Sequence, residues 1–158
     1  MFFPKTGKFY KPHFEKVMMI EALKMCHTEG GRLSEYRSEA EYEAVVAMQC
    51  RLTLSNAISA YLTKMCFSLH LVMLNDDMWV GLANPDLNSC TSGSSNECDN
   101  KFRWIDDDFS AAAPLEGKVE ADGDGTCFAM TNNGNTVRDQ SCREVAKFAC
   151  EFVCESGE

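Results

Sequence analysis

The side chains best suited to chemistry in this 158-residue chain are carboxylates in one acidic segment, residues 106–125. The segment holds seven acidic residues against a single lysine, and four of the seven stand close together: Glu116, Glu120, Asp122 and Asp124. Calcium ions prefer oxygen ligands of this kind, so the group offers the chemistry of a calcium site. A solvated acidic loop is the favoured interpretation, because a run of like charges usually forms a hydrated surface.

Two further sequence patterns do not indicate a metal site or a catalytic site. The run Asp122-Gly123-Asp124-Gly125 begins as an EF-hand loop does, but the next two residues break the pattern and no glutamate closes it. The three histidines (His13, His27 and His70) have no partner carboxylate at a spacing that indicates catalysis, which favours structural or surface roles. Since no motif marks an activated nucleophile either, we expect that the protein is not an enzyme.

Composition narrows the classes of partner. With 15 basic and 24 acidic residues the formal charge is −9, which disfavours binding to nucleic acid. The longest apolar stretch, residues 58–74, contains Lys64 and His70 and falls short of a membrane span. Nine cysteines in one domain-sized chain indicate an oxidising compartment, so we expect a secreted or extracellular protein.

The elements that must position these groups follow from periodicity and turn signals. Apolar residues at helical spacing predict a helix over residues 14–28, which Gly30 and Gly31 end. The capping box that begins at Ser38 and closes at Glu41 predicts the start of a second helix. A 3.6-residue period then runs from Leu54 to Val72 and predicts a further helix around residues 55–74.

The sequence pattern of the second half of the chain is typical of strands. Short apolar runs at residues 78–82, 101–105, 127–131 and 147–153 predict strands, and residues 132–135 predict a hairpin turn. Helices followed by strands indicate an α+β fold. Within these strands Trp79 and Trp104 are predicted to lie in the core.

Several of these motifs follow one another in an order that resembles the C-type lectin-like domain. They are Cys26, Gly30-Gly31-Arg32-Leu33, Ser38-Glu39-Ala40-Glu41, Trp79-Val80-Gly81-Leu82, Phe102-Arg103-Trp104-Ile105-Asp106, Cys127, Asp139, Cys142 and Phe148-Ala149-Cys150-Glu151. The resemblance implies two helices flanking small antiparallel sheets, with a long loop that carries recognition. We expect one domain over residues 8–154, with residues 1–7 as an N-terminal extension, residues 155–158 as a tail, and the helix around 55–74 as an insertion.

The resemblance also implies two disulfides, Cys26 with Cys150 and Cys127 with Cys142. Cys90 and Cys98 flank a tip rich in serine and glycine, and we expect them to close a local hairpin. Three cysteines stay unassigned: Cys50, Cys66 and Cys154. On one straight helix the first two would stand about 24 Å apart, so they pair only if the helix folds back; otherwise one of them meets the third.

Sugar-binding members of this family hold calcium with oxygen-bearing residues on both sides of a loop proline and with an Asn-Asp pair after a tryptophan. Here Ala113 and Leu115 flank the loop proline, and Val137-Arg138-Asp139 replaces the triplet, so that only Asp139 remains. We therefore expect no cofactor, and calcium-independent binding of a protein or glycan through residues 88–100 and 106–138. The alternative is a carbohydrate-binding lectin with an atypical calcium site in the acidic loop. Arg138 is predicted either to form an ion pair within the loop or to contact the ligand.

The predicted helix around residues 55–74 carries a broad apolar stripe that must be covered. It either folds back on the domain or packs against a second copy. Because nine cysteines leave one thiol without a partner in the chain, our hypothesis is a weak homodimer.

Overall fold

The computed structural model describes residues 1–53, 76–84, 102–105, 110–111, 119–120, 125–131 and 136–153. Two helices and a mixed sheet make up this part of the chain. The elements, in chain order, are β1 (Phe2–Phe3), β2 (Lys8–Val17), α1 (Met19–Thr28), β3 (Arg32–Leu33), α2 (Glu39–Thr53), β4 (Met78–Ala83), β5 (Arg103–Trp104), β6 (Ser110–Ala111), β7 (Val119–Glu120), β8 (Cys127–Thr131), β9 (Thr136–Gln140) and β10 (Ala146–Val153).

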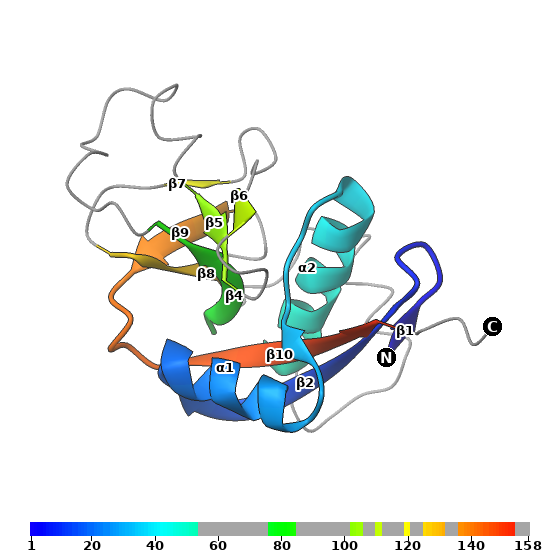
Figure 1. Cartoon of the computed structure of the whole chain (residues 1–158), viewed down its shortest axis with the longest axis horizontal. Helices are drawn as coiled ribbons and strands as arrows, with labels where there is room; N and C mark the ends of the chain where they lie inside the picture. The colour runs from blue at the N-terminus through cyan, green and yellow to red at the C-terminus, as the bar shows by residue number, and fades with distance from the viewer. Residues whose placement is uncertain are drawn as a thin grey trace.

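The sheet runs in the order β1-β2-β10-β4-β8-β9-β7, and the short strands β3, β5 and β6 attach to its side (Figure 1). Most neighbouring strands are antiparallel, as predicted, but β10 pairs with β4 and β7 pairs with β9 in parallel. The long β2–β10 pair brings the two ends of the domain together, with Lys8 opposite Val153. The architecture is therefore α+β.

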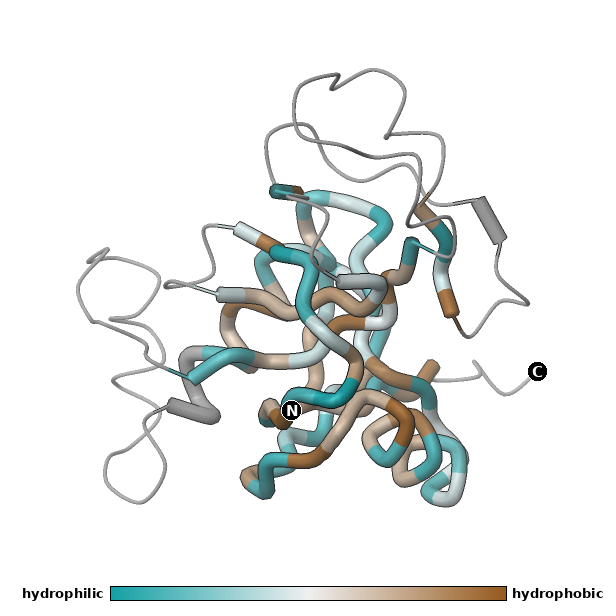
Figure 2. The backbone as a smooth tube through the Cα atoms, turned by 90° about the vertical axis from the view of Figure 1, so that its left-hand side faces the viewer, coloured by the Kyte–Doolittle hydropathy of each residue, from teal (hydrophilic) through white to brown (hydrophobic). Residues whose placement is uncertain are grey.

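The two helices pack against opposite faces of this sheet. Phe148 and Cys150 of β10 contact the cluster that contains α1, whereas Ala149 between them contacts the cluster that contains α2. Successive side chains of a strand point to opposite faces, which explains this alternation. Figure 2 shows apolar and hydrophilic stretches interspersed along the backbone tube. Trp79 and Trp104 are buried, as predicted.

One predicted element is wrong in its first part. Residues 14–17 belong to β2, not to a helix, and α1 begins only at Met19. The apolar spacing of Phe14 and Val17 fits a helix equally well, but the ladder between β2 and β10 decides the outcome. Phe14 is exposed in this strand, so its apolar side chain is not evidence that the position is buried.

The remaining predicted boundaries agree closely with the structure. Gly30, at a φ of 80°, ends α1, a conformation that glycine adopts without strain. The Glu41 amide donates to Ser38 Oγ at the start of α2, while the Glu41 carboxylate accepts from the Arg37 amide, one residue earlier than a capping box would have it. The predicted hairpin turn and the helix around 55–74 lie outside the described residues. In the described part no helix is long and apolar enough to cross a membrane.

Candidate functional site

Two of the predicted ligand-binding residues meet where β7 pairs with β9. Glu120 lies opposite Arg138 in this parallel ladder, and the Arg138 Nε donates to Glu120 Oε2 at 2.8 Å. Both side chains are about half exposed, at 50% and 51%. The ion pair that was one of two predictions for Arg138 is therefore present, and it lies on the surface beside the acidic segment.

Asp139, the next residue along β9, has a different environment. Its carboxylate is buried and accepts a hydrogen bond from the Gly125 amide at 3.3 Å. Gly125 packs so closely that an added Cβ atom would lie 2.0 Å from the Gln140 carbonyl oxygen. Asp139 thus anchors the end of the acidic segment to β9.

A disulfide fixes the base of the same region. Cys127 at the start of β8 is bonded to Cys142, just after β9, and the Thr126 hydroxyl lies 3.0 Å from the Cys142 sulfur. The second disulfide, Cys26–Cys150, joins α1 to β10. Both bonds are those that the resemblance implied. Cross-links of this kind restrict the unfolded chain and so stabilise a fold with long loops.

The described residues of this region offer few oxygen ligands to a calcium ion. A calcium ion needs six to eight oxygen ligands. Of the oxygens described here, Oε2 of Glu120 already accepts from Arg138, and one oxygen of Asp139 accepts from a backbone amide. The Arg138 guanidinium, which pairs with Glu120, adds positive charge where a cation would have to bind.

The other predicted site residues lie outside the described part of the chain. These are the loop carboxylates and the cysteines of the expected local hairpin, namely Glu116, Asp122, Asp124, Cys90 and Cys98. The same holds for Cys66 and Cys154, and although Cys50 falls within α2, its side chain is not described.

Sequence reasoning missed a buried cluster of charges under β3 and α2. The Glu151 carboxylate, 1% exposed, accepts from Lys8 at 3.1 Å, from Arg32 at 2.7 Å and from the Glu35 amide at 3.1 Å. Burial raises the pKa of the neighbouring Glu35 carboxyl. The members come from four separate elements and loops, so no local spacing could have indicated the cluster.

It also missed the surroundings of His13. The ring is buried, with Nε2 at 3.3 Å from Glu29 Oε2 and Nδ1 at 3.7 Å from Glu15 Oε1. Glu15 lies two residues along β2, and in a strand that spacing places both side chains on one face. The signal was present in the sequence, but the predicted helix over residues 14–28 concealed it.

Comparisons with known proteins agree with this geometry. The sequence model described as "Lectin C-type domain" matches residues 15–152. Snaclec coagulation factor IX/factor X-binding protein subunit B3 of Trimeresurus stejnegeri is 28% identical over 148 residues, covering 92% of this chain and 86% of that protein.

Two solved structures share the fold at low sequence identity. Human lithostathine has a TM-score of 0.57 at 18% identity, covering 93% of this chain and 92% of its own. The mouse scavenger receptor C-type lectin carbohydrate-recognition domain has a TM-score of 0.59 at 16% identity, covering 94% and 92%. With the family match over residues 15–152, the motif order and both disulfides on one fold, this chain belongs to the C-type lectin domain family.

Proposed function

We propose that this domain is a non-catalytic, extracellular recognition module that binds a protein or glycan ligand without calcium. We assign the binding surface to residues 88–100 and 106–138, which include Arg138 and Glu120. The observation that carries the proposal is the ion pair between Arg138 and Glu120, next to the buried Asp139.

The Arg138–Glu120 pair supports calcium independence and a polar recognition surface at once. The Arg138 guanidinium binds a Glu120 carboxylate oxygen that a cation would need as a ligand. The pair also presents a half-exposed guanidinium and a half-exposed carboxylate to a ligand. An exposed ion pair adds little to stability, so both groups exchange partners at low cost when a ligand docks. Arginine at an interface is among the residues that contribute most to binding energy.

Charge favours a partner with a basic surface. The chain carries −9, and its acidic segment holds seven carboxylates against one lysine. Complementary charge speeds association and selects among partners. The snaclec relative is named for binding coagulation factors IX and X, which supports a protein ligand, and the mouse relative is titled a carbohydrate-recognition domain, which supports a glycan. We favour a protein with a basic patch.

The extracellular location rests on the two described disulfides, since such bonds persist in oxidising compartments.

The homodimer through the helix around residues 55–74 is a separate proposal. Light scattering at increasing protein concentration tests it, with Leu62→Glu as the probe. A monomer at every concentration contradicts it.

The binding proposal is tested by presenting the purified protein to a glycan array and to a panel of extracellular protein domains, with calcium and with a chelator. We expect binding to survive chelation, to weaken as salt is added and to fall in Glu120→Gln, which removes a negative charge that a basic partner would contact. Glu144→Gln, which changes an exposed carboxyl on the turn between β9 and β10, is the matched control. Binding that requires calcium, or that both variants leave unchanged, contradicts the proposal.

A further inference from the structure

A row of aromatic side chains lies at the end of the sheet where strand β1 and the two termini are found (Figure 1). Phe2 of β1 stands opposite Phe9 of β2, and Phe9 stands opposite Phe152 of β10. Directly opposite residues of antiparallel strands have their side chains on the same face of the sheet. The ring centroids of Phe9 and Phe152 are 6.3 Å apart. These three residues form what we call the aromatic row.

The outer part of the aromatic row is open to solvent. Phe2 is 52% exposed and Phe9 is 43% exposed, whereas Phe152 packs partly against the core. Gly31 covers the inner end, because a Cβ atom there would lie 2.7 Å from the Phe152 ring. Two adjacent open phenylalanine rings make an apolar patch, and contiguous patches of this kind mark interaction surfaces.

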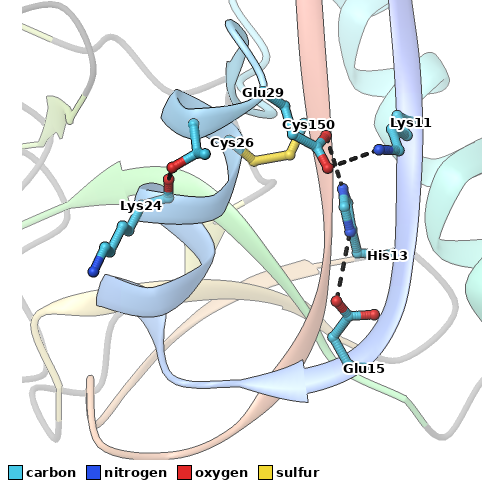
Figure 3. Close-up of a disulfide and its surroundings, with 8 residues drawn as sticks. Lys11, His13, Glu15, Lys24, Cys26, Glu29 and Cys150 are labelled. Atoms are coloured by element: carbon cyan, nitrogen blue, oxygen red, sulfur yellow. Dashed lines mark hydrogen bonds and ion pairs between the residues drawn. A yellow bond between two sulfur atoms is a disulfide. The ribbon is translucent and has the colours of Figure 1, made fainter.

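The charges around the aromatic row are paired within the chain. Lys11, two residues after Phe9 and therefore on the same face of β2, donates to Glu29 at 2.7 Å (Figure 3). Lys5, in the turn between β1 and β2, lies 3.8 Å from Glu43. Two copies of a chain that carries −9 repel each other. Because the charges beside the row are balanced locally, this repulsion opposes association less here than at the acidic segment.

The cysteine count indicates what covers the aromatic row. Nine cysteines cannot all pair within one chain, so at least one is left for another molecule in an oxidising compartment. Four of them form the two described disulfides, and Cys90 and Cys98 are expected to pair with each other. On that pairing, the thiol without a partner in the chain is one of Cys50, Cys66 and Cys154.

Helix α2 lies along β10 and β2, and its two ends contact different ends of these strands. Near the start of α2, the Glu41 carboxylate is 2.7 Å from the Lys8 ammonium, and Lys8 stands opposite Val153, the last residue of β10. Near its end, Gln49 Nε2 donates to the Asp76 carbonyl at 3.3 Å. The two ends of α2 are therefore tied to separate parts of the sheet.

This arrangement keeps Cys50 away from Cys154. The Asp76 carboxylate accepts from Lys147, the second residue of β10, at 2.6 Å. Lys147 and Val153 are six residues apart, which is about 20 Å on a strand. Cys50 comes one residue after the glutamine that contacts Asp76, whereas Cys154 comes one residue after Val153. A disulfide needs Cα atoms within about 7 Å, so these two cysteines do not pair with each other.

Of the two, Cys154 is the one that another molecule can reach. It follows Val153, which is 61% exposed, and consecutive Cα atoms stand about 3.8 Å apart. Phe152 of the aromatic row is only two positions earlier in the chain. Cys50, in contrast, follows three buried residues of α2, 47–49.

We propose that this chain forms a two-fold homodimer in which the aromatic rows of two copies pack together and a disulfide joins Cys154 of one copy to Cys154 of the other. In each chain Cys50 then pairs with Cys66. A two-fold axis brings the same surface of both copies together, so the row and the cysteine next to it each meet their own counterpart. This contact differs from the one proposed above through the helix around residues 55–74.

Formation of the link is balanced by a disulfide oxidant, for which oxidised glutathione serves in the experiment. The Cys154 thiolate attacks the oxidant, forms a mixed disulfide and releases one glutathione thiolate. The second copy's thiolate then attacks the protein sulfur and releases the other glutathione. Two protein thiols lose two protons and two electrons, and one oxidised glutathione becomes two reduced molecules.

The aromatic row and the proposed recognition surface lie at opposite ends of the strand order. That order begins with β1, which carries Phe2, and finishes with β7, which carries Glu120. A dimer through the row therefore leaves the Arg138–Glu120 pair of both copies open. On the function proposed above, the dimer presents two binding surfaces, and bivalent attachment to a clustered partner is tighter than attachment through one surface.

The test uses the full chain under oxidising conditions without any ligand, so its outcome is independent of the proposed binding function. Non-reducing electrophoresis and light scattering measure the covalent dimer, and mapping of non-reduced peptides identifies the linked cysteines. We expect a dimer joined through Cys154 in the wild type and a monomer in Cys154→Ser. Leu62→Glu, which probes the other proposed contact, should leave the covalent dimer in place.

Substitutions in the aromatic row test the packing separately from the disulfide. In a glutathione redox buffer, Phe2→Ser and Phe9→Ser should each lower the equilibrium constant for dimer formation about 10-fold, because each change is present in both copies. Phe14→Ser, a residue 46% exposed on the same strand but outside the row, is the matched control. Circular dichroism checks the fold, and Phe2→Ser decides the question if Phe9→Ser folds poorly.

Three results would overturn the proposal. The first is a wild-type protein that stays monomeric at every concentration, with Cys154 free, capped by glutathione or joined to Cys66. The second is a dimer linked through any other cysteine. The third is a dimer whose equilibrium constant changes equally in Phe14→Ser and in the variants of the aromatic row.

Discussion

The Lys8 ammonium donates a hydrogen bond to the Glu151 carboxylate, 3.1 Å away, although 143 positions separate the two residues in the chain. Lys8 also lies 2.7 Å from the Glu41 carboxylate of α2, so one buried cation joins β2, β10 and α2. Charges this deeply buried are retained only when they are paired, because the cost of removing them from water is large.

Replacing Lys8 with methionine should therefore destabilise the fold strongly. The variant removes the ammonium partner of Glu41 and leaves Glu151 with Arg32 and the Glu35 amide. Breaking one partner of a buried ion pair costs on the order of 3 kcal/mol, and urea unfolding measures it. Lys5→Met is the matched control, because Lys5 is 80% exposed and 3.8 Å from Glu43. Equal effects of the two substitutions would show that the buried pairing does not stabilise the protein.

A second prediction concerns the dependence of stability on pH. Asp76 accepts hydrogen bonds from Lys147 at 2.6 Å and pairs with Lys16 at 2.7 Å, and these contacts lower its pKa below the ordinary 3.8. A carboxyl whose folded pKa is depressed contributes stability above its unfolded pKa, and that stability is lost as pH falls through the folded pKa.

Asp76→Asn should accordingly lower the free energy of unfolding at neutral pH and have a shrinking effect as the solution is acidified below about pH 4. Denaturant unfolding of both proteins across this range measures the difference. Glu144→Gln, an exposed carboxyl on the turn before β10, serves as the control. A difference between wild type and Asp76→Asn that stays constant with pH contradicts the interpretation.

Gly125 should not tolerate a side chain. A Cβ atom there would lie 2.0 Å from the Gln140 carbonyl oxygen, which belongs to backbone and cannot turn away. We expect Gly125→Ala to destabilise the fold by about 1–3 kcal/mol, the usual effect of overpacking. At Gly81 the nearest atom, 3.0 Å from the added carbon, is the Glu35 Cγ of a side chain, so Gly81→Ala should cost less. The reverse order in thermal unfolding would contradict this.

The fold and the candidate site differ in how much of each the sequence alone predicts. Local signals placed α2, β4, β8 and β10 within a residue or two, because caps, apolar runs and turns are read from neighbouring residues. The family motifs supplied both described disulfides, which spacing could not have paired. Strand β2 was not predicted, and its last four residues were assigned to a helix, because its identity depends on a ladder with β10, more than a hundred residues away.

The candidate sites also combine residues that the sequence indicates with contacts that it does not. Arg138 and Asp139 were selected from the sequence, but the partner of Arg138 follows from the parallel pairing of β7 with β9. The carboxylate nearest to the His13 ring, that of Glu29, comes from the end of α1, and no spacing in the sequence links the two residues. Contacts between distant segments are set by the sheet order, and the sequence pattern does not contain that order.

The last prediction concerns calcium. If the long-loop region held calcium at one hundred times its dissociation constant, the ion would stabilise the fold by about 2.7 kcal/mol. We expect millimolar calcium to leave the melting temperature unchanged, because one carboxylate oxygen of Glu120 and one of Asp139 already accept hydrogen bonds within the protein. Asp139→Asn is a more specific probe than Asp139→Ala. The asparagine oxygen can still accept from the Gly125 amide, while the negative charge is removed. Calorimetric calcium binding in wild type that disappears in Asp139→Asn would favour the alternative, a calcium-dependent lectin with an atypical site in the acidic segment.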